Sequence, residues 1–198
     1  MADDVADDPK SVLHRYLRGQ REALRWKLDG LDEHDIRRPM TPTGTNLLGL
    51  VKHCAGVEAG YFGECFGRTV PDLPPWYAEM EDDPNLDLWA SESESRADIL
   101  GFADRVAAHA DALIDELDLD ATGSVPWWGE RGRGVTLHFL LVHVIADLAR
   151  HAGHADILRE TIDGAIGMRP SAPNLPKGDP DFWQRHRARV QEAADSFR

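Results

Sequence analysis

The sequence predicts an all-α protein built around a four-helix bundle. Four long segments repeat apolar residues at the i, i+3, i+4 and i+7 spacing of an amphipathic helix. No segment alternates convincingly between polar and apolar residues, and no Rossmann, P-loop or Gly-x-Ser-x-Gly pattern is present. We therefore expect a bundle with long crossover loops and a short C-terminal helix.

Length and charge limit the class of protein. A chain of 198 residues, 42% of them apolar, suits one domain with a sizeable core and an appended tail. We expect a disordered acidic N-terminus at residues 1–10, the bundle at 11–166, and a linker with the C-terminal helix at 167–198. The formal net charge of −13 opposes binding to nucleic acid. No apolar run is long enough for a membrane span and no signal peptide is evident, so the expected location is the cytoplasm, without a membrane partner.

The first half of the chain predicts two helices and a structured crossover. The first helix is expected at residues 11–29, and the second runs from Thr45 or Asn46 to residue 67, with glycines that indicate a close neighbour. Cys54 and Cys65 would lie about 16 Å apart on that helix, too far for a disulfide, so both should be free thiols. Residues 67–91 should form a crossover that packs its aromatic side chains over the bundle, namely Trp76, Tyr77 and Trp89.

The second half predicts two more bundle helices. The third helix begins at Ser91, Ser93 or Ser95 and ends near Leu119. A glycine-rich loop at 121–134 carries two adjacent tryptophans, and the fourth helix follows at 135–163. After a Gly/Pro-rich connector, an amphipathic helix at 181–197 is expected to lie on the bundle or to bind a partner.

The fourth helix carries a polar stripe beside its apolar face. His143, Asp147, His151 and His154 fall within an arc of about 80° next to Leu137, Leu140, Val144 and Leu148. Buried imidazoles need hydrogen bonds or a metal ion to offset the loss of water. One ion cannot take all four side chains, because the first and last lie about 16 Å apart. The possible pairs are 143 with 147, 147 with 151, and 151 with 154, and spacing alone does not choose among them.

A third ligand is available from the second helix. His53 stands among apolar residues there, and with a pair from the fourth helix it would give a three-ligand nitrogen and oxygen site with an open position. The ligand types favour zinc, with iron, nickel or manganese as alternatives. The competing interpretation is that these histidines are hydrogen-bonded core residues. The remaining histidines lie in charged or polar settings and are expected to be solvated: His14, His34, His109, His138 and His186.

Two segments resemble a known superfamily. The string HVxxDxARHAGHADILRE at 143–160 and the string TNLLGLVKH at 45–53 are similar to the corresponding helices of the DinB/YfiT-like superfamily, especially its actinobacterial branch of small proteins. The likeness covers about residues 12–169. It implies a four-helix bundle, often a homodimer, that binds a divalent metal through one histidine of the second helix and two residues of the fourth.

The resemblance also implies a site and an activity. By position, the metal ligands would be His53, Asp147 and His151, with Asp147 where relatives commonly have His or Glu. His154 stands where many relatives carry Gln, and could be a catalytic proton shuttle, a neighbour of the ligands or a substitute ligand. Relatives include mycothiol-dependent maleylpyruvate isomerase and mycothiol or bacillithiol S-transferases. Candidate residues for the wall of a pocket that binds the thiol are Tyr61, Trp127, Trp128 and Arg150.

Three functions follow from these observations. The first is a metal-dependent transferase that joins a mycothiol-like thiol, acting as cosubstrate, to an electrophilic small molecule through a metal-activated thiolate. The second is a metal-dependent hydrolase or isomerase at the same site. The third is a non-catalytic stress-response or binding dimer whose histidines are structural.

Overall fold

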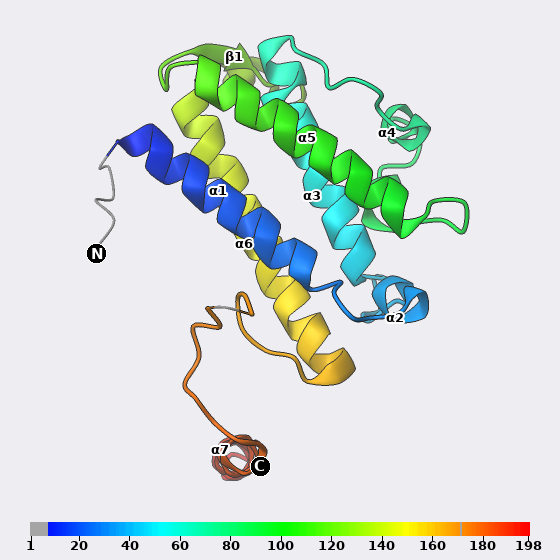
Figure 1. The fold of residues 1–198 in the computed structure, drawn as a ribbon, viewed down its shortest axis with the longest axis vertical. Coiled ribbons are helices and arrows are strands. Elements are labelled where there is room, and N and C mark those ends of the chain that lie inside the picture. Colours follow the sequence, from blue (N-terminus) through cyan, green and yellow to red (C-terminus); the bar gives the residue numbers. More distant parts are fainter. Residues whose placement is uncertain (1–7, 171) are drawn as a thin grey trace. The chain divides into compact units, whose positions relative to one another are not determined.

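The computed structural model describes residues 8–170 and 172–198 (Figure 1). It divides into two compact units, one ending at Ile166 and one from Gly167 to Arg198, and each is considered by itself. The elements of the first unit are α1 (Pro9–Trp26), α2 (Glu33–Arg37), α3 (Leu47–Phe62), η1 (Glu64–Phe66), α4 (Pro75–Glu79), η2 (Leu86–Leu88), α5 (Arg96–Glu116), β1 (Thr122–Ser124), η3 (Pro126–Gly132), β2 (Arg133–Thr136) and α6 (Leu137–Asp163). The second unit contains α7 (Pro180–Asp195).

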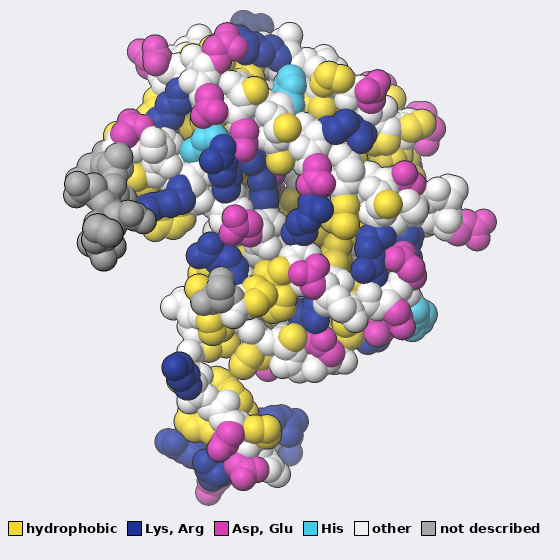
Figure 2. Space-filling view, viewed as in Figure 1, with side chains coloured by type: hydrophobic (Ala, Val, Ile, Leu, Met, Phe, Trp, Pro, Cys, Tyr) yellow, Lys and Arg dark blue, Asp and Glu magenta, His cyan; other side chains and the backbone are white. Residues whose placement is uncertain are grey.

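Four helices form the bundle, as the sequence predicts. Helix α1 packs along α6, and α3 packs against both α5 and α6. In Figure 1, α1 and α5 lie in front of α6 and α3. Apolar side chains fill the interior at the helical spacing read from the sequence; fully buried examples are Leu17, Leu48, Phe62, Ile114, Leu140 and Leu148. Charged side chains are spread over the outer face that Figure 2 shows. In the described part of the chain, no helix is long and apolar enough to cross a membrane.

Helix ends follow local capping chemistry. The Asn46 side chain accepts a hydrogen bond from the Gly49 amide and starts α3, and Ser95 forms a reciprocal capping box with Asp98 at the start of α5. Gly164, in the left-handed conformation, ends α6. Helix α1 begins at Pro9, two residues before the expected Ser11, because the carboxylate of Asp8 provides the cap. The other residues expected to be disordered, 1–7, lie outside the described residues.

Other expectations at the sequence level were wrong in detail. The second helix ends at Phe62, so Cys65 lies in the short η1 turn and not in the same helix as Cys54. Both thiols are free, as predicted, and both are buried. Strands β1 and β2 pair antiparallel, although no strand was expected. Each strand is too short for an alternating pattern to stand out in the sequence.

The crossover between α3 and α5 lies directly against α3. A Cβ atom built at Gly49 would be 1.9 Å from the carbonyl oxygen of Leu88. The buried ammonium group of Lys52 donates to the carbonyl of Trp89 at 2.9 Å, which ties the crossover to α3. Trp76 is buried as predicted, whereas Trp89 is 47% exposed. These contacts fix the part of the crossover that approaches His53.

Buried charges hold α1 near α5. His14, expected to be solvated, is buried, and its Nε2 lies 2.7 Å from the Asp111 carboxylate. Arg21 donates from Nε to both oxygens of Glu58, at 3.0 and 2.9 Å, and from Nη1 to Asp111 at 2.6 Å. The expectation for His14 failed because its partner lies 97 residues away in the chain.

Candidate metal centre

Helices α3 and α6 face each other through two matched contacts. The rings of His53 and His151 meet edge to face with centroids 4.7 Å apart. The Nε2 atom of His143 lies 3.1 Å from the Tyr61 hydroxyl oxygen. Because both pairs are separated by eight residues along their helices and in opposite directions, the two helices run antiparallel along one continuous polar seam. We call this the α3–α6 seam.

One part of the α3–α6 seam gathers potential metal ligands. His53, Asp147 and His151 each offer a ligand atom, and these atoms all lie within 4.8 Å of one another. The side chains are partly buried, and the His151 Nε2 atom lies 3.7 Å from Asp147 Oδ1. Of the pairings that spacing leaves open, 147 with 151 is the one whose atoms converge with His53 among the described residues. Two imidazoles and a carboxylate form a donor set that suits zinc and similar divalent ions.

A second carboxylate orients His53. The Asp87 carboxylate, from η2 of the crossover, lies 2.6 Å from His53 Nδ1 and is almost buried. Because a carboxylate accepts hydrogen bonds, the proton lies on Nδ1 and the Nε2 lone pair is left for a metal ion. Sequence analysis missed Asp87. It lies among several acidic residues in a loop, and nothing in the sequence marks it as the one that reaches His53.

The protonation state of His151 also suits metal binding. Burial lowers its pKa, and the neighbouring His53 ring lowers it further, so the neutral imidazole is favoured. Its Nδ1 atom is buried and lacks a hydrogen-bond partner among the described residues. Such an atom costs free energy unless something else satisfies it. The donor set, the oriented His53 and the neutral His151 together fit a divalent metal ion.

The other predicted site residues fall into two groups. His154 and Arg150 are exposed on α6 near the triad, and the rings of His154 and His151 lie 5.4 Å apart. Tyr61 and Trp128 lie instead against His143, two helical turns from His151, and Trp127 packs on Tyr61. The structure therefore separates His143 from the three converging residues and places it in an aromatic cluster.

The aromatic cluster has a defined hydrogen-bond direction. The Trp127 indole donates to the Tyr61 hydroxyl oxygen at 3.4 Å, and Tyr61 in turn lies within hydrogen-bond distance of His143. Burial raises the pKa of Tyr61, so its hydroxyl keeps its proton. Trp127 is 51% exposed, and a Cβ atom at Gly60 would lie 3.1 Å from its ring. Gly60 thus allows an exposed indole to lie directly on α3.

The fold and the site define a small helical-bundle protein with a candidate two-histidine, one-aspartate centre between two of its helices. Residues 12–164 match the family model for mycothiol S-transferases, and the chain belongs to this DinB-like family. A comparison with curated proteins gave no match. The family supports a mycothiol-related transferase function and confirms the resemblance found in the two helical motifs.

Proposed function

We propose that this protein is a metal-dependent transferase that joins mycothiol, or a similar small thiol, to an electrophilic molecule. The observation that supports this most is the convergence of His53, Asp147 and His151, with His53 oriented by Asp87, in a chain of the mycothiol S-transferase family. Three protein ligands leave a coordination position for a substrate atom.

The proposal assigns separate roles to the metal and to the chain. A bound divalent ion, zinc by ligand type or else nickel, iron or manganese, would lower the pKa of the thiol and favour the thiolate. Asp87 holds His53 in one tautomer and orientation, and burial keeps His151 neutral. These two features prepare the donor set before any ligand arrives, so little reorganisation is needed on binding.

We assign proton transfer to His154. Its imidazole is exposed and lies next to His151, so it can accept a proton near the triad and pass it to water. In the reaction, the thiol loses its proton to His154 and the sulfur electron pair forms a bond to the electrophilic carbon. A leaving group departs with its bonding electrons. Tyr61, Trp127, Trp128 and Arg150 are proposed to line the substrate pocket.

Elemental analysis of protein purified without a histidine tag tests the metal site. About one divalent ion per chain is expected in the wild type, and close to none in His53→Ala or His151→Ala. His138→Ala is the matched control, because His138 is exposed on the same helix as His151. A folded wild type that takes up no zinc, nickel, iron or manganese contradicts the proposal and supports structural histidines.

Activity separates the transferase from a hydrolase or isomerase at the same site. The metal-loaded protein is incubated with a bimane electrophile, with and without mycothiol, and the thioether product is measured. The proposal expects product only with the thiol and a large loss in His53→Ala. Turnover of an ester or an enol substrate without any thiol would favour the alternative reactions, and thiol-independent binding without turnover would favour the binding dimer.

The homodimer stays a prediction. We propose that the interface lies on the outer face of α6, where three apolar residues are exposed: Phe139, Val142 and Ile157. Light scattering coupled to size-exclusion chromatography is expected to give twice the chain mass, and a concentration-independent monomer would contradict it.

A further inference from the structure

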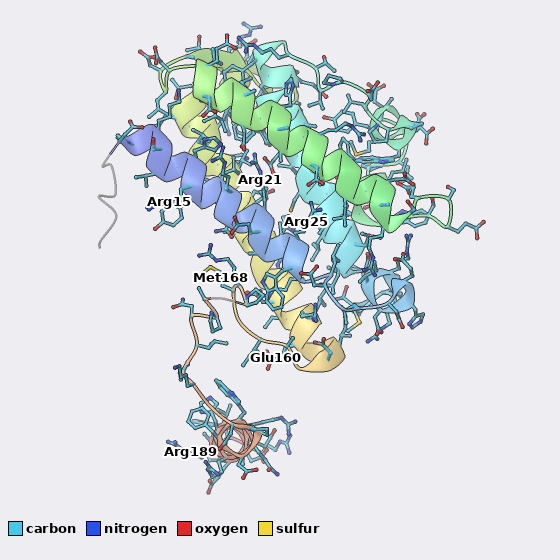
Figure 3. All side chains as sticks on the ribbon, viewed as in Figure 1. Arg15, Arg21, Arg25, Glu160, Met168 and Arg189 are labelled. Atoms are coloured by element: carbon cyan, nitrogen blue, oxygen red, sulfur yellow. The ribbon has the colours of Figure 1, made fainter. Side chains whose placement is uncertain are left out.

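The facing surfaces of α1 and α5 are joined mainly by ion pairs. Arg21 contacts Asp111, Arg18 contacts Asp111 at 3.0 Å, and Arg25 pairs with Asp104. Arg21 and Arg25 extend from α1 on the side that faces α5 (Figure 3). We call this region the α1–α5 seam.

A cavity lies beneath these ion pairs. Its volume is about 170 Å³, and its floor comes from α3 and α6. In Figure 2, apolar side chains are visible between the charged groups at the centre of this face. The apolar residues that line most of the cavity are Leu24, Val51, Ala55, Leu100, Ala103 and Ala107.

Small side chains create the space. Ala103 and Ala107 lie one turn apart on α5 and face the cavity, opposite Ala55 on α3. Apolar cavities of about 150 Å³ can bind benzene. The space between these alanines therefore matches one aromatic ring.

The charges at the mouth limit what can enter. Arg21 is held by Glu58 and Asp111, and Arg25 is held by Asp104, so the cations that border the cavity already have anionic partners. An ionic ligand would have to break these pairs and lose its own hydration inside an apolar space. A peptide is too large to pass beneath the ion pairs that join the two helices. A small neutral molecule meets neither obstacle.

We propose that this cavity is a binding site for a small, neutral, apolar molecule about the size of one aromatic ring, which enters between α1 and α5. The site is distinct from the candidate metal centre. Cys54 and Leu148 line the cavity, while their sequence neighbours His53 and Asp147 point about 100° away around the same helices. The two sites therefore lie on different faces of α3 and α6, and share the helices between them.

Binding of fluorobenzene, followed by ¹⁹F NMR and calorimetry, tests the proposal on the full chain. Saturable binding is expected for the wild type, with a loss of affinity of more than about tenfold in Ala103→Leu combined with Ala107→Leu, whose larger side chains fill the cavity. Ala108→Leu is the matched control, because Ala108 is exposed on the same helix and should leave binding unchanged. His53→Ala should also bind normally, which separates this proposal from the proposed transferase function.

The double variant Ala103→Leu/Ala107→Leu, here called the filled variant, could lose binding because it misfolds. A measurement on the wild type tests the proposal without that variant. Methyl NMR should show that fluorobenzene shifts the resonances of Leu24, Leu100 and Leu148 first. Absence of saturable binding by the wild type, equal binding by the filled variant, or shifts confined to other methyl groups would each overturn the proposal.

Discussion

The two seams of the bundle use similar side chains in opposite ways. In the α1–α5 seam, His14 lies 2.7 Å from Asp111, and Arg21 is shared between Glu58 and Asp111, so the buried charges satisfy one another. In the α3–α6 seam, His151 lies 3.7 Å from Asp147, and its buried Nδ1 atom lacks a hydrogen-bond partner among the described residues. Matched polar groups stabilise a fold, whereas the three potential ligand atoms that converge in the α3–α6 seam can bind something else.

The largest expected effect separates the histidines of the two seams. His53→Ala should remove the bound metal and lower thiol conjugation by at least about a hundredfold, because one of three ligands is lost. His14→Ala should keep its metal, since that histidine only pairs with carboxylates of α5. Elemental analysis gives the metal content of both variants. Loss of metal from His14→Ala as well as from His53→Ala would show that the two seams do not differ in this way.

The second prediction concerns stability. Arg21→Met should lower the free energy of unfolding by about 3–5 kcal/mol, because it leaves the buried Glu58 carboxylate without its partner. Adding Glu58→Gln should recover part of that loss, since the remaining side chain carries no charge. Urea unfolding measures the difference, and metal stoichiometry should stay at the wild-type value in every variant that folds. If Arg21→Met alone were as stable as the wild type, the ion pair between Arg21 and Glu58 would contribute little to stability.

A smaller effect is expected at Asp87. Asp87→Asn removes the carboxylate that orients His53 but leaves the three ligands in place, so metal affinity should fall about 10- to 100-fold. Competition with a chromophoric chelator gives the affinity. Asp83→Asn, an exposed change in the same crossover, is the control. Unchanged affinity in Asp87→Asn would mean that the hydrogen bond to His53 is only structural.

The smallest expected effect is the contribution of Asp111 to stability, which depends on pH. Burial opposes ionisation of Asp111, but hydrogen bonds from Arg21 and His14 outweigh it and lower the pKa of this carboxyl group. Its contribution to stability is thus present above its unfolded pKa of about 4 and is lost as the pH falls through the lower folded value. Asp111→Asn should cost about 1–2 kcal/mol at pH 7. Urea unfolding should show this cost shrinking below about pH 4, and a constant cost from pH 7 to 3 would contradict the assignment.

Local patterns in the sequence predicted most of the fold. The helices of the bundle follow from apolar periodicity and from caps such as Asn46 and Ser95, which depend on residues close in the chain. Histidines beside an apolar stripe indicated a metal site, and the family resemblance selected His53, Asp147 and His151. That choice matches the group whose ligand atoms converge, although metal binding itself stays a prediction.

The features that sequence analysis missed depend on distant partners. Asp87 reaches His53 from a crossover that has no periodicity, and His14 looks solvated until Asp111 is brought beside it. The short β1–β2 pairing likewise depends on where two loop segments meet. No local rule specifies such contacts, because each partner is chosen by the packing of whole helices.

The close approach of the crossover to Gly49 makes the geometry of the candidate metal centre depend on a residue that is not one of the candidate ligands. Any other residue there would push away the Leu88 carbonyl, and Asp87 is the next residue in the crossover. If the proposed metal site exists, a mutation at this glycine should therefore weaken it, although the Gly49 residue carries no side chain that could bind the ion. A survey of natural variants that considers only the three candidate ligands would miss a change at Gly49.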